Sequence, residues 1–279
     1  MGTFIQIFFR IRPYNQPVIE FLFGGMLILL GSLLVGMIGY GLEAIFLQLP
    51  FFIGIILQAI VFNATFSMRG LWQASGEIQA ALENSNLVEA RKLLAWHLVS
   101  RDTSQLDQAS VSAATVESVA ENASDSVVAS LVFFTLGGLP LALIYRFVNT
   151  ADAMLGYRDK AREWTGKFPA RMDDAFNYIP ARLTALLIIT GALLIGRDWQ
   201  GAWRTTRQDA RLTESPNAGY PMSAMAGALG VKLEKTDLYS LGAGNRLPSV
   251  QDIQNTRILL IVASLLTIFV LLPVFFLRW

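Results

Sequence analysis

The sequence predicts an all-α protein that crosses a membrane several times. Of its 279 residues, 53% are hydrophobic and only 15% are charged, and the mean hydropathy is +0.47. A soluble domain carries about 25% charged residues. Four apolar stretches are long enough to cross a bilayer, at residues 21–42, 44–68, 127–148 and 258–277, and a shorter one lies at 183–196. We therefore expect one membrane domain over residues 1–279 with four to five apolar helices, some broken or re-entrant, plus cytoplasmic amphipathic helices.

Residues 1–68 are predicted to form an N-terminal membrane hairpin. Arg10 and Arg12 precede the first apolar stretch, whereas the turn after it contains only Glu43. Because positive residues favour the cytoplasmic side, the N-terminus and the section after residue 68 are expected in the cytoplasm. The first stretch also lacks the short core and small-residue cleavage pattern of a signal peptide, so we expect it to be retained as a span.

Residues 69–126 read as a polar helical section. Apolar residues recur near helical spacing over 76–98, and Ser104-Gln-Leu-Asp107 resembles a capping box that opens the next helix. In that helix Glu117, Glu121 and Asp125 are spaced i, i+4 and i+8, which places them on one side. Such a ridge is often a solvated face, but acids at the edge of an apolar segment are costly unless they pair or bind something. The ridge is therefore a candidate site.

Residues 127–257 combine broken apolar segments with polar connections. Gly137, Gly138 and Pro140 interrupt the stretch at 127–148. If that stretch crossed the membrane completely, the basic connection at 158–171 would lie outside, against the usual charge distribution. We therefore expect 127–148 and 183–196 to be re-entrant or protein-buried, with all polar motifs facing the cytoplasm, before residues 258–279 close the chain with a final span.

Further polar residues cluster after the broken segment. The group from Tyr145 to Tyr157 has helical spacing, and a second group follows at 173–182. The turn at 215–219 leads into a helix at 223–230 whose small residues permit close backbone approach, and such a turn at a helix entrance could hold an anion.

Composition also excludes several kinds of site. The chain has no cysteine and one histidine, so it has no disulfide, thiolate nucleophile or histidine metal site. It contains none of the standard phosphate-binding loops, dinucleotide fingerprints or serine elbows. The net charge of +1 gives no reason to expect nucleic acid as a partner.

These clusters together resemble the adenosylcobinamide-phosphate synthase family of cobalamin biosynthesis over residues 60–257. The motifs that carry the resemblance are Arg101-Asp-Thr-Ser-Gln-Leu106, Glu117-Ser-Val-Ala-Glu-Asn122 with Ser124-Asp125, Tyr145-Arg-Phe-Val-Asn-Thr150 with Asp152, Gly156-Tyr-Arg158, Asp173-Asp174 with Asn177-Tyr-Ile-Pro-Ala-Arg-Leu-Thr184, and Ser215-Pro-Asn-Ala-Gly219 with Met225-Ala-Gly-Ala-Leu-Gly-Val231.

The resemblance implies a multi-pass inner-membrane ligase that joins adenosylcobyric acid to aminopropanol or its phosphate, with ATP and Mg²⁺. Amide formation from a carboxylate requires activation, which an acyl phosphate supplies. Such a site needs oxygen ligands for magnesium, cations for phosphate and a base for the ammonium. On this view the catalytic candidates are Glu117, Glu121, Asp125, Asp173 and Asp174, of which the first three are the candidate magnesium ligands. The candidates for substrate binding are Arg146, Asn149, Asp152, Tyr157, Arg158, Asn177, Arg182, Ser215 and Asn217.

Two alternatives stay open. The chain lacks the Gly-Asp-Pro segment with which the family usually begins, and Asn63 stands where the family has a lysine that could meet phosphate. These departures leave open, as the alternative to the enzyme, a non-catalytic relative that acts as a membrane scaffold or regulatory subunit. For either function, the expected protein partners are further copies of the chain in a homo-oligomer or other membrane subunits. The broken apolar segments would also suit a small-molecule transporter, although the sequence shows no two-half symmetry. In every case membrane lipid is a partner.

Overall fold

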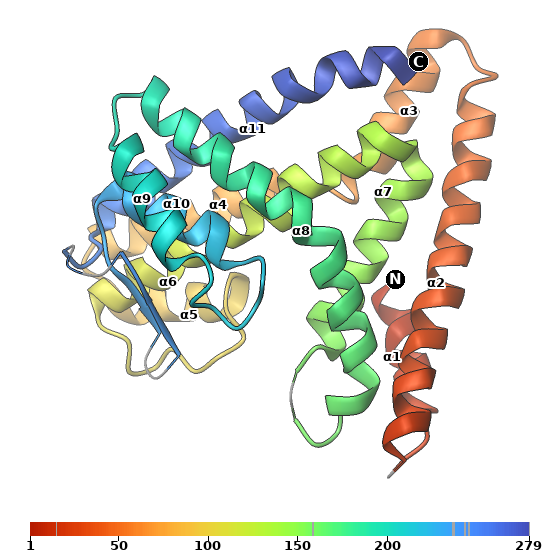
Figure 1. Cartoon of the computed structure of the whole chain (residues 1–279), viewed down its shortest axis with the longest axis horizontal. Helices are drawn as coiled ribbons and strands as arrows, with labels where there is room; N and C mark the ends of the chain where they lie inside the picture. The colour runs from red at the N-terminus through yellow and green to blue at the C-terminus, as the bar shows by residue number, and fades with distance from the viewer. Residues whose placement is uncertain (15, 158, 236–237, 243, 245, 279) are drawn as a thin grey trace. The chain divides into compact units, whose positions relative to one another are not determined.

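Helices make up most of the chain in the computed structural model, which describes every residue except 15, 158, 236, 237, 243, 245 and 279 (Figure 1). Among the described residues, four helices are long and apolar enough to cross a membrane, or up to five if the bent pair α3 and α4 forms one span. The predicted class, a helical multi-pass membrane protein, is confirmed. The elements are α1 (Gly2–Arg10), α2 (Pro17–Phe46), α3 (Phe51–Asn63), α4 (Met68–Glu83), α5 (Leu87–His97), α6 (Gln108–Asn122), the π-helix η1 (Ala123–Val128), α7 (Ala129–Leu155), α8 (Glu163–Leu194), α9 (Trp199–Asp209), α10 (Gly219–Leu229), β1 (Leu233–Lys235), β2 (Tyr239–Leu241) and α11 (Val250–Arg278).

The chain forms two compact units, and three of its long helices contribute to both. The first unit comprises Met1–Phe66, Ser130–Asn177 and Pro273–Trp279, and the second comprises Ser67–Ala129 and Tyr178–Leu272.

In the first unit, α1 and α2 pack against α7 and the first half of α8. Ile5, Leu27 and Phe147 are among the fully buried residues of this core. Helix α2 approaches its neighbours closely because glycines recur along one stripe: a Cβ added at Gly24 would collide with a backbone carbonyl of α8, and one at Gly31 with the ring of Phe147. Small residues at a helix interface are the usual way in which membrane helices approach this closely.

Helix α7 is broken where the sequence predicts it. Gly138 has φ 63° and ψ −154°, and Pro140 follows inside the same helix. The break leaves a backbone N–H free, and Glu43 of α2 caps it: its Oε2 accepts a hydrogen bond from the Leu139 nitrogen at 3.0 Å. Glu43 itself is buried. A carboxylate is therefore built into the first unit as a cap for a helix that starts anew within an apolar segment.

Two segments that were predicted to be continuous helices are each divided by a turn in the structure. The apolar stretch at 44–68 is not one helix, because α2 continues to Phe46 and a turn ending at Pro50 separates it from α3; α3 and α4 are then bent by 46°. The periodic segment at 76–98 is divided between α4 and α5 at Ser85, which has a φ of 56°. Hydrophobic periodicity continues across such short turns, so it does not reveal them.

The second unit has its own core between α4, α5, α6 and α11, with Ile78, Leu94, Val111 and Ile253 fully buried. Helix α10 packs on α9 through glycine: a Cβ on Gly227 would meet the Gly201 carbonyl and would lie 2.6 Å from the Ala202 Cα. The small residues of α10 thus serve close helix packing, as predicted.

The structure also contains one short β-hairpin, which was not predicted. Strands β1 and β2 pair antiparallel, with Lys235 opposite Tyr239. Each strand has only three residues. That length is too short for alternation of polar and apolar residues to be recognised in the sequence.

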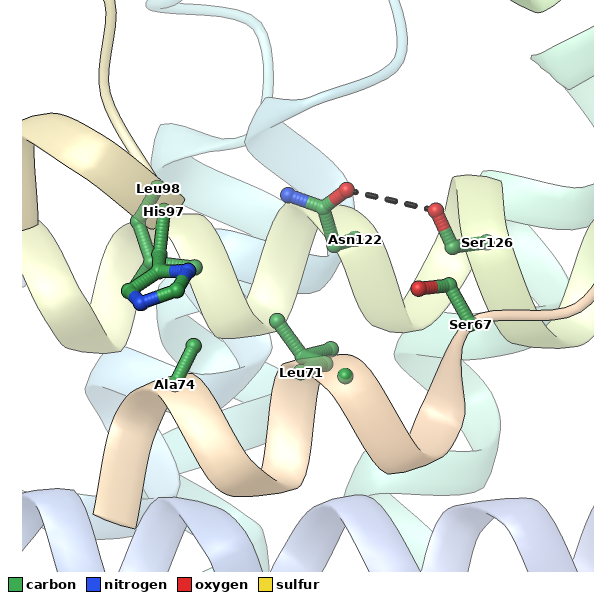
Figure 2. Close-up of a pocket in the computed structure, with 8 residues that line it drawn as sticks. Ser67, Leu71, Ala74, His97, Leu98, Asn122 and Ser126 are labelled. Atoms are coloured by element: carbon green, nitrogen blue, oxygen red, sulfur yellow. Dashed lines mark hydrogen bonds between the residues drawn. The ribbon is translucent and has the colours of Figure 1, made fainter. Parts of the chain in front are cut away.

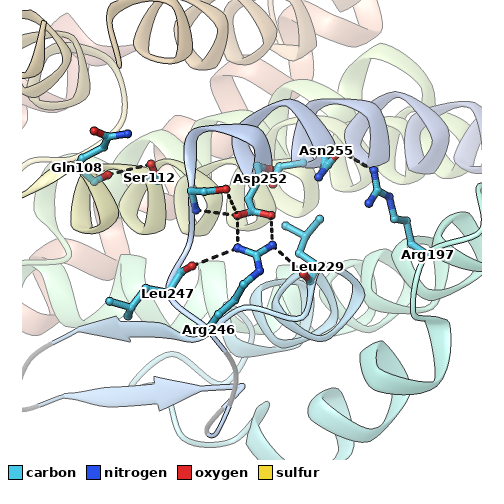
Figure 3. Close-up of polar contacts among 10 residues, drawn as sticks. Gln108, Ser112, Arg197, Leu229, Arg246, Leu247, Asp252 and Asn255 are labelled. Carbon is cyan, nitrogen blue, oxygen red and sulfur yellow. Dashed lines mark hydrogen bonds and ion pairs between the residues drawn. The ribbon is translucent and has the colours of Figure 1, made fainter. Parts of the chain in front are cut away.

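The N-terminal end of α11 is held by an ion pair (Figure 3). Arg246 binds Asp252 through two hydrogen bonds of 2.7 Å, and the Ser249 nitrogen and hydroxyl donate to the same carboxylate at 2.7 and 2.8 Å. Asp252 is buried, whereas the Arg246 side chain is 54% exposed. The bond to Asp252 raises the pKa of Arg246, so the guanidinium stays charged throughout the accessible pH range.

We expect Arg246→Ala to lower the stability of the second unit by about 2 kcal/mol, because a buried carboxylate loses a bidentate charged partner and keeps only Ser249. The apparent melting temperature in detergent measures the effect. Arg204→Ala is the matched control, since Arg204 is exposed on α9 and its side chain forms no hydrogen bond or ion pair among the described residues. Equal melting temperatures for the two variants would show that the ion pair does not stabilise this end of the helix.

Candidate functional site

The acidic face of α6 meets the β-hairpin within the second unit. Helix α6 begins at Asp107, whose carboxylate accepts a hydrogen bond from the Ser110 nitrogen at 2.8 Å. The predicted capping box is therefore misplaced by one turn: Ser104 instead bonds to Asp102. The true cap at Asp107 is of the residue type that most favours helix starts, and it leaves Glu117 in the third turn of the helix.

Glu117 is the most deeply placed acid of this face. Its residue is 6% exposed, and its Oε1 has no hydrogen-bond partner among the described residues. Around its carboxylate lie the charges of Arg101, Glu121 and Lys235 and the phenol of Tyr239. A buried carboxylate with an unused oxygen is costly in a purely structural role, because burial without a hydrogen bond forfeits its solvation.

Tyr239 adds a donor to this cluster. Burial of the phenol, followed by the negative charges of Glu117 and Glu121, raises the pKa of Tyr239 far above its usual value. The phenol therefore keeps its proton at any physiological pH and can only act as a hydrogen-bond donor or as a neutral acceptor. Its partner in the sheet, Lys235, is brought to the same place by the hairpin pairing.

The three acids predicted as magnesium ligands lie on two different elements. Among the described residues, no group of three or more His, Asp or Glu side chains could hold a metal ion. Glu117 and Glu121 lie on α6, whereas Asp125 lies in the π-helix η1, whose turn is wider than that of an α-helix. Glu117 and Glu121 remain neighbours. Two carboxylates fit Mg²⁺ if the remaining ligands are water and substrate phosphate, which is the usual way in which proteins bind this ion with phosphate substrates.

A small pocket of about 230 Å³ adjoins the end of α6 (Figure 2). Asn122, Ser126 and Ser67 present amide and hydroxyl groups to it, and His97 lies at its other end. The Ser126 hydroxyl donates to Asn122 Oδ1 at 3.3 Å. The pocket is polar and of a size that suits a small polar molecule.

In the first unit, the predicted residues of α7 and α8 form a continuous hydrogen-bond chain. The Tyr145 hydroxyl donates to Asn177 Oδ1 at 2.8 Å, and Asn177 donates to Asp173 Oδ2 at 2.9 Å. Asn149 donates to Asp173 Oδ1 at 3.2 Å and accepts from Arg146 Nη1 at 3.3 Å. Asp173 is thus bound at both oxygens and is better suited to hold these amides in place than to act as a base.

The other predicted residues of the first unit lie at an open pocket of about 470 Å³. Tyr157 and Asp174 line it together with Lys167 and Arg171, two cations of α8 to which the sequence analysis gave no role. Asp152 lies near the end of α7, four residues before Gly156 of this pocket. Its backbone carbonyl accepts a hydrogen bond from the Gly156 nitrogen at 2.6 Å. Arg158 lies outside the described residues. Basic and acidic groups together around an open pocket suit a polar, charged ligand.

Arg182 is a fixed residue of the second unit. Its guanidinium stacks on the rings of Tyr178 and Tyr220 at 3.5 and 4.1 Å, and its Nη1 donates to Asn217 Oδ1 at 3.1 Å. The Ser215 hydroxyl accepts the Asn217 nitrogen at 3.2 Å and the Ala218 nitrogen at 3.3 Å, which fixes the turn before α10. The predicted turn is present, but its serine oxygen is used within the turn.

The predicted residues are divided between the two units. The first unit contains Arg146, Asn149, Asp152, Tyr157, Asp173, Asp174 and Asn177, and the second contains Glu117, Glu121, Asp125, Arg182, Ser215 and Asn217. The sequence analysis missed Arg101, Lys235 and Tyr239 as neighbours of Glu117. Arg101 belongs to one of the motifs that carry the family resemblance. Lys235 and Tyr239 could have been paired only if the short hairpin had been predicted from the sequence.

Comparison with known proteins places the chain in a family. The family model described as CobD/Cbib protein matches residues 1–265. The chain is 42% identical over 242 residues to cobalamin biosynthesis protein CobD of Dehalococcoides mccartyi, which covers 87% of this chain and 78% of the relative. It is 38% identical over 240 residues to cobalamin biosynthesis protein CbiB of Salmonella paratyphi A, covering 83% and 75%.

A third relative aligns over a shorter region. The chain is 45% identical over 190 residues to the probable cobalamin biosynthesis protein CobD of Methanothermobacter thermautotrophicus, which covers 68% of this chain and 63% of the relative, less than two thirds of its length. No solved structure matches the chain. The match of the family model over nearly the whole chain, with relatives of this identity, makes the assignment plain: the chain belongs to the CobD/CbiB family of cobalamin biosynthesis proteins.

Proposed function

We propose that this protein is a ligase that forms the amide bond between adenosylcobyric acid and aminopropanol or aminopropanol phosphate, driven by ATP. The observation that carries the proposal is the cluster around Glu117: a buried carboxylate with an unused oxygen, a second acid, two cations and a protonated phenol. Acids and cations in one cluster match the needs of a reaction that handles phosphate, magnesium and an amine.

The proposed reaction has two balanced steps. A carboxylate oxygen of the corrinoid attacks the γ-phosphorus of ATP, and ADP leaves. The amine nitrogen then attacks the carbonyl carbon of the acyl phosphate, loses a proton and expels inorganic phosphate. Arg101 and Lys235 would neutralise phosphate charge, and Glu117 or Glu121 would accept the amine proton. Magnesium, bound by these acids and the nucleotide, would offset the negative charge of the phosphates.

The first unit has a polar region of its own, for which we propose a role in binding a substrate. The hydrogen-bond chain that runs from Arg146 through Asp173 to Tyr145 is rigid because each member is bound by its neighbours. It would orient the polar periphery of the corrinoid or of the amine. Lys167 and Arg171 would favour an anionic group in the pocket that Tyr157 and Asp174 line. The family's membership in cobalamin biosynthesis supports a corrinoid as the substrate.

Purified protein in detergent, supplied with cobyric acid, aminopropanol and Mg-ATP, tests the proposal. We expect a product whose mass equals the two substrates joined with loss of water, together with one ADP and one phosphate per product. Omission of ATP or of the amine should abolish it, and aminopropanol phosphate in parallel identifies the preferred amine. Absence of product in all arms, with a stoichiometric membrane partner co-purifying, would favour the scaffold or regulatory subunit instead.

A further inference from the structure

A groove of about 480 Å³ in the second unit combines an apolar wall with a cationic rim. The C-terminal half of α8 supplies the wall through Ala185, Leu186 and Ile189, and the end of α9 with the residues after it supplies Arg207 and Arg211. All of these residues belong to the second unit. Nothing in the proposed reaction uses this apolar wall.

The cations of this groove carry uncompensated charge. Arg207 and Arg211 are exposed and form no ion pair or side-chain hydrogen bond among the described residues. The hydrogen bonds of Arg182, at the same groove, all go to oxygens of neutral groups, namely two carbonyls and the Asn217 amide. The nearest acid in the sequence, Asp209, accepts a hydrogen bond from the Gly242 nitrogen at 2.7 Å. Three arginines without a carboxylate partner in the described chain call for an external anion.

The wall points to hydrocarbon attached to that anion. Helix α8 is one of the helices apolar and long enough to cross a membrane. Of its residues in the groove, Leu186 is 50% exposed, whereas Ala185 and Ile189 lie buried beneath it. Trp203, 45% exposed, lines the groove beside the arginines. Tryptophan next to exposed aliphatic residues and cations is the arrangement found where a membrane protein meets lipid headgroups.

We propose that this groove is a binding site for an anionic phospholipid, with the phosphate of its headgroup on Arg207 and Arg211 and an acyl chain along Leu186 and Trp203. An anionic lipid would contact both the arginines and the apolar side chains of the groove. A free phosphate would leave the apolar side chains exposed to water, and a neutral lipid would leave the arginines without a negatively charged partner. The sequence analysis expected Arg182 to bind a phosphate group of the substrate. In this proposal the arginines still bind a phosphate group, but that group belongs to a lipid.

Native mass spectrometry of the full-length protein in detergent tests the site by titration with short-chain phosphatidylglycerol and, separately, phosphatidylcholine. We expect one phosphatidylglycerol to bind more tightly than any phosphatidylcholine. Arg211→Gln should weaken that binding about fivefold, the loss expected for one cation at a lipid headgroup. Arg204→Gln is the matched control, because it removes one exposed arginine from α9 that does not line this groove, and it should leave the affinity unchanged.

A competition arm separates a lipid site from a phosphate site. Glycerol phosphate carries the headgroup charge without hydrocarbon, so it should not displace the bound lipid at concentrations at which the lipid does. Quenching of tryptophan fluorescence by brominated phosphatidylglycerol, reduced in Trp203→Phe, is expected for an acyl chain in the groove. Equal affinity for both lipids, equal losses in Arg204→Gln and Arg211→Gln, or displacement by glycerol phosphate as effective as by lipid would each overturn the proposal. Melting temperatures equal to that of the unaltered protein exclude misfolding of either arginine variant as the cause.

Discussion

Glu117→Gln is expected to reduce amide formation by at least about 100-fold while the protein still accumulates in the membrane, because loss of a positioned base or a metal-binding carboxylate removes that much of the rate. The substitution keeps the size and the shape of the side chain. It removes the negative charge that lies among Arg101, Lys235 and Tyr239 and replaces one acceptor oxygen with an NH₂ donor. Product formed per minute at saturating ATP and amine measures the effect.

Two measurements sharpen the interpretation of that loss. If Glu117 holds magnesium, a higher magnesium concentration should restore part of the rate in Glu117→Asp; if it accepts the amine proton, magnesium should have no effect. Glu89→Gln serves as the control, since Glu89 is an exposed acid of the same unit, paired with Lys92 at 3.8 Å. Full turnover in Glu117→Gln would remove this residue from the reaction and leave the proposed function without its main structural support.

The acids of α6 show how much of the candidate site could be predicted from the sequence. Glu117 and Glu121 are neighbours because four residues make about one turn of an α-helix, and that rule needs nothing beyond the sequence. Asp125 was expected in the same row, but it lies in the π-helix at Ala123–Val128, whose wider turn the spacing of the residues does not reveal. Short-range periodicity is therefore reliable only up to the first irregular turn.

Contacts between distant segments were beyond prediction for a different reason. The Tyr145 and Asn177 side chains form a hydrogen bond although they lie 32 residues apart in the sequence. Lys235 and Tyr239 lie near Glu117 only because a hairpin of two three-residue strands folds onto α6. The separate motifs were visible, but their pairing depends on which helices pack together. Apolar segments and the break at Gly138 were predictable, since glycine and proline act locally on the backbone.

That break provides the second large effect: Gly138→Ala is expected to cost about 2–4 kcal/mol of stability. Its φ of 63° with ψ of −154° is a backbone conformation that side chains with a Cβ adopt only at considerable cost. The added Cβ would also run into the Glu43 carboxylate, which caps Leu139. Both effects act at one point, where the chain restarts a helix inside an apolar segment, and an apparent melting temperature in detergent reports them.

A double-mutant cycle separates the two contributions. Glu43→Ala alone should lower stability, because the Leu139 nitrogen loses its partner in an apolar surrounding. When Glu43→Ala is combined with Gly138→Ala, the collision with the carboxylate is gone, so the combined loss should be smaller than the sum of the single losses by the cost of that collision. Gly41→Ala on the same helix as Glu43 is the control, since an added Cβ there meets no atom within 4 Å. If Gly138→Ala melts at the same temperature as Gly41→Ala, the break in α7 does not depend on glycine, and the cap by Glu43 is a consequence of the kink and not one of its supports.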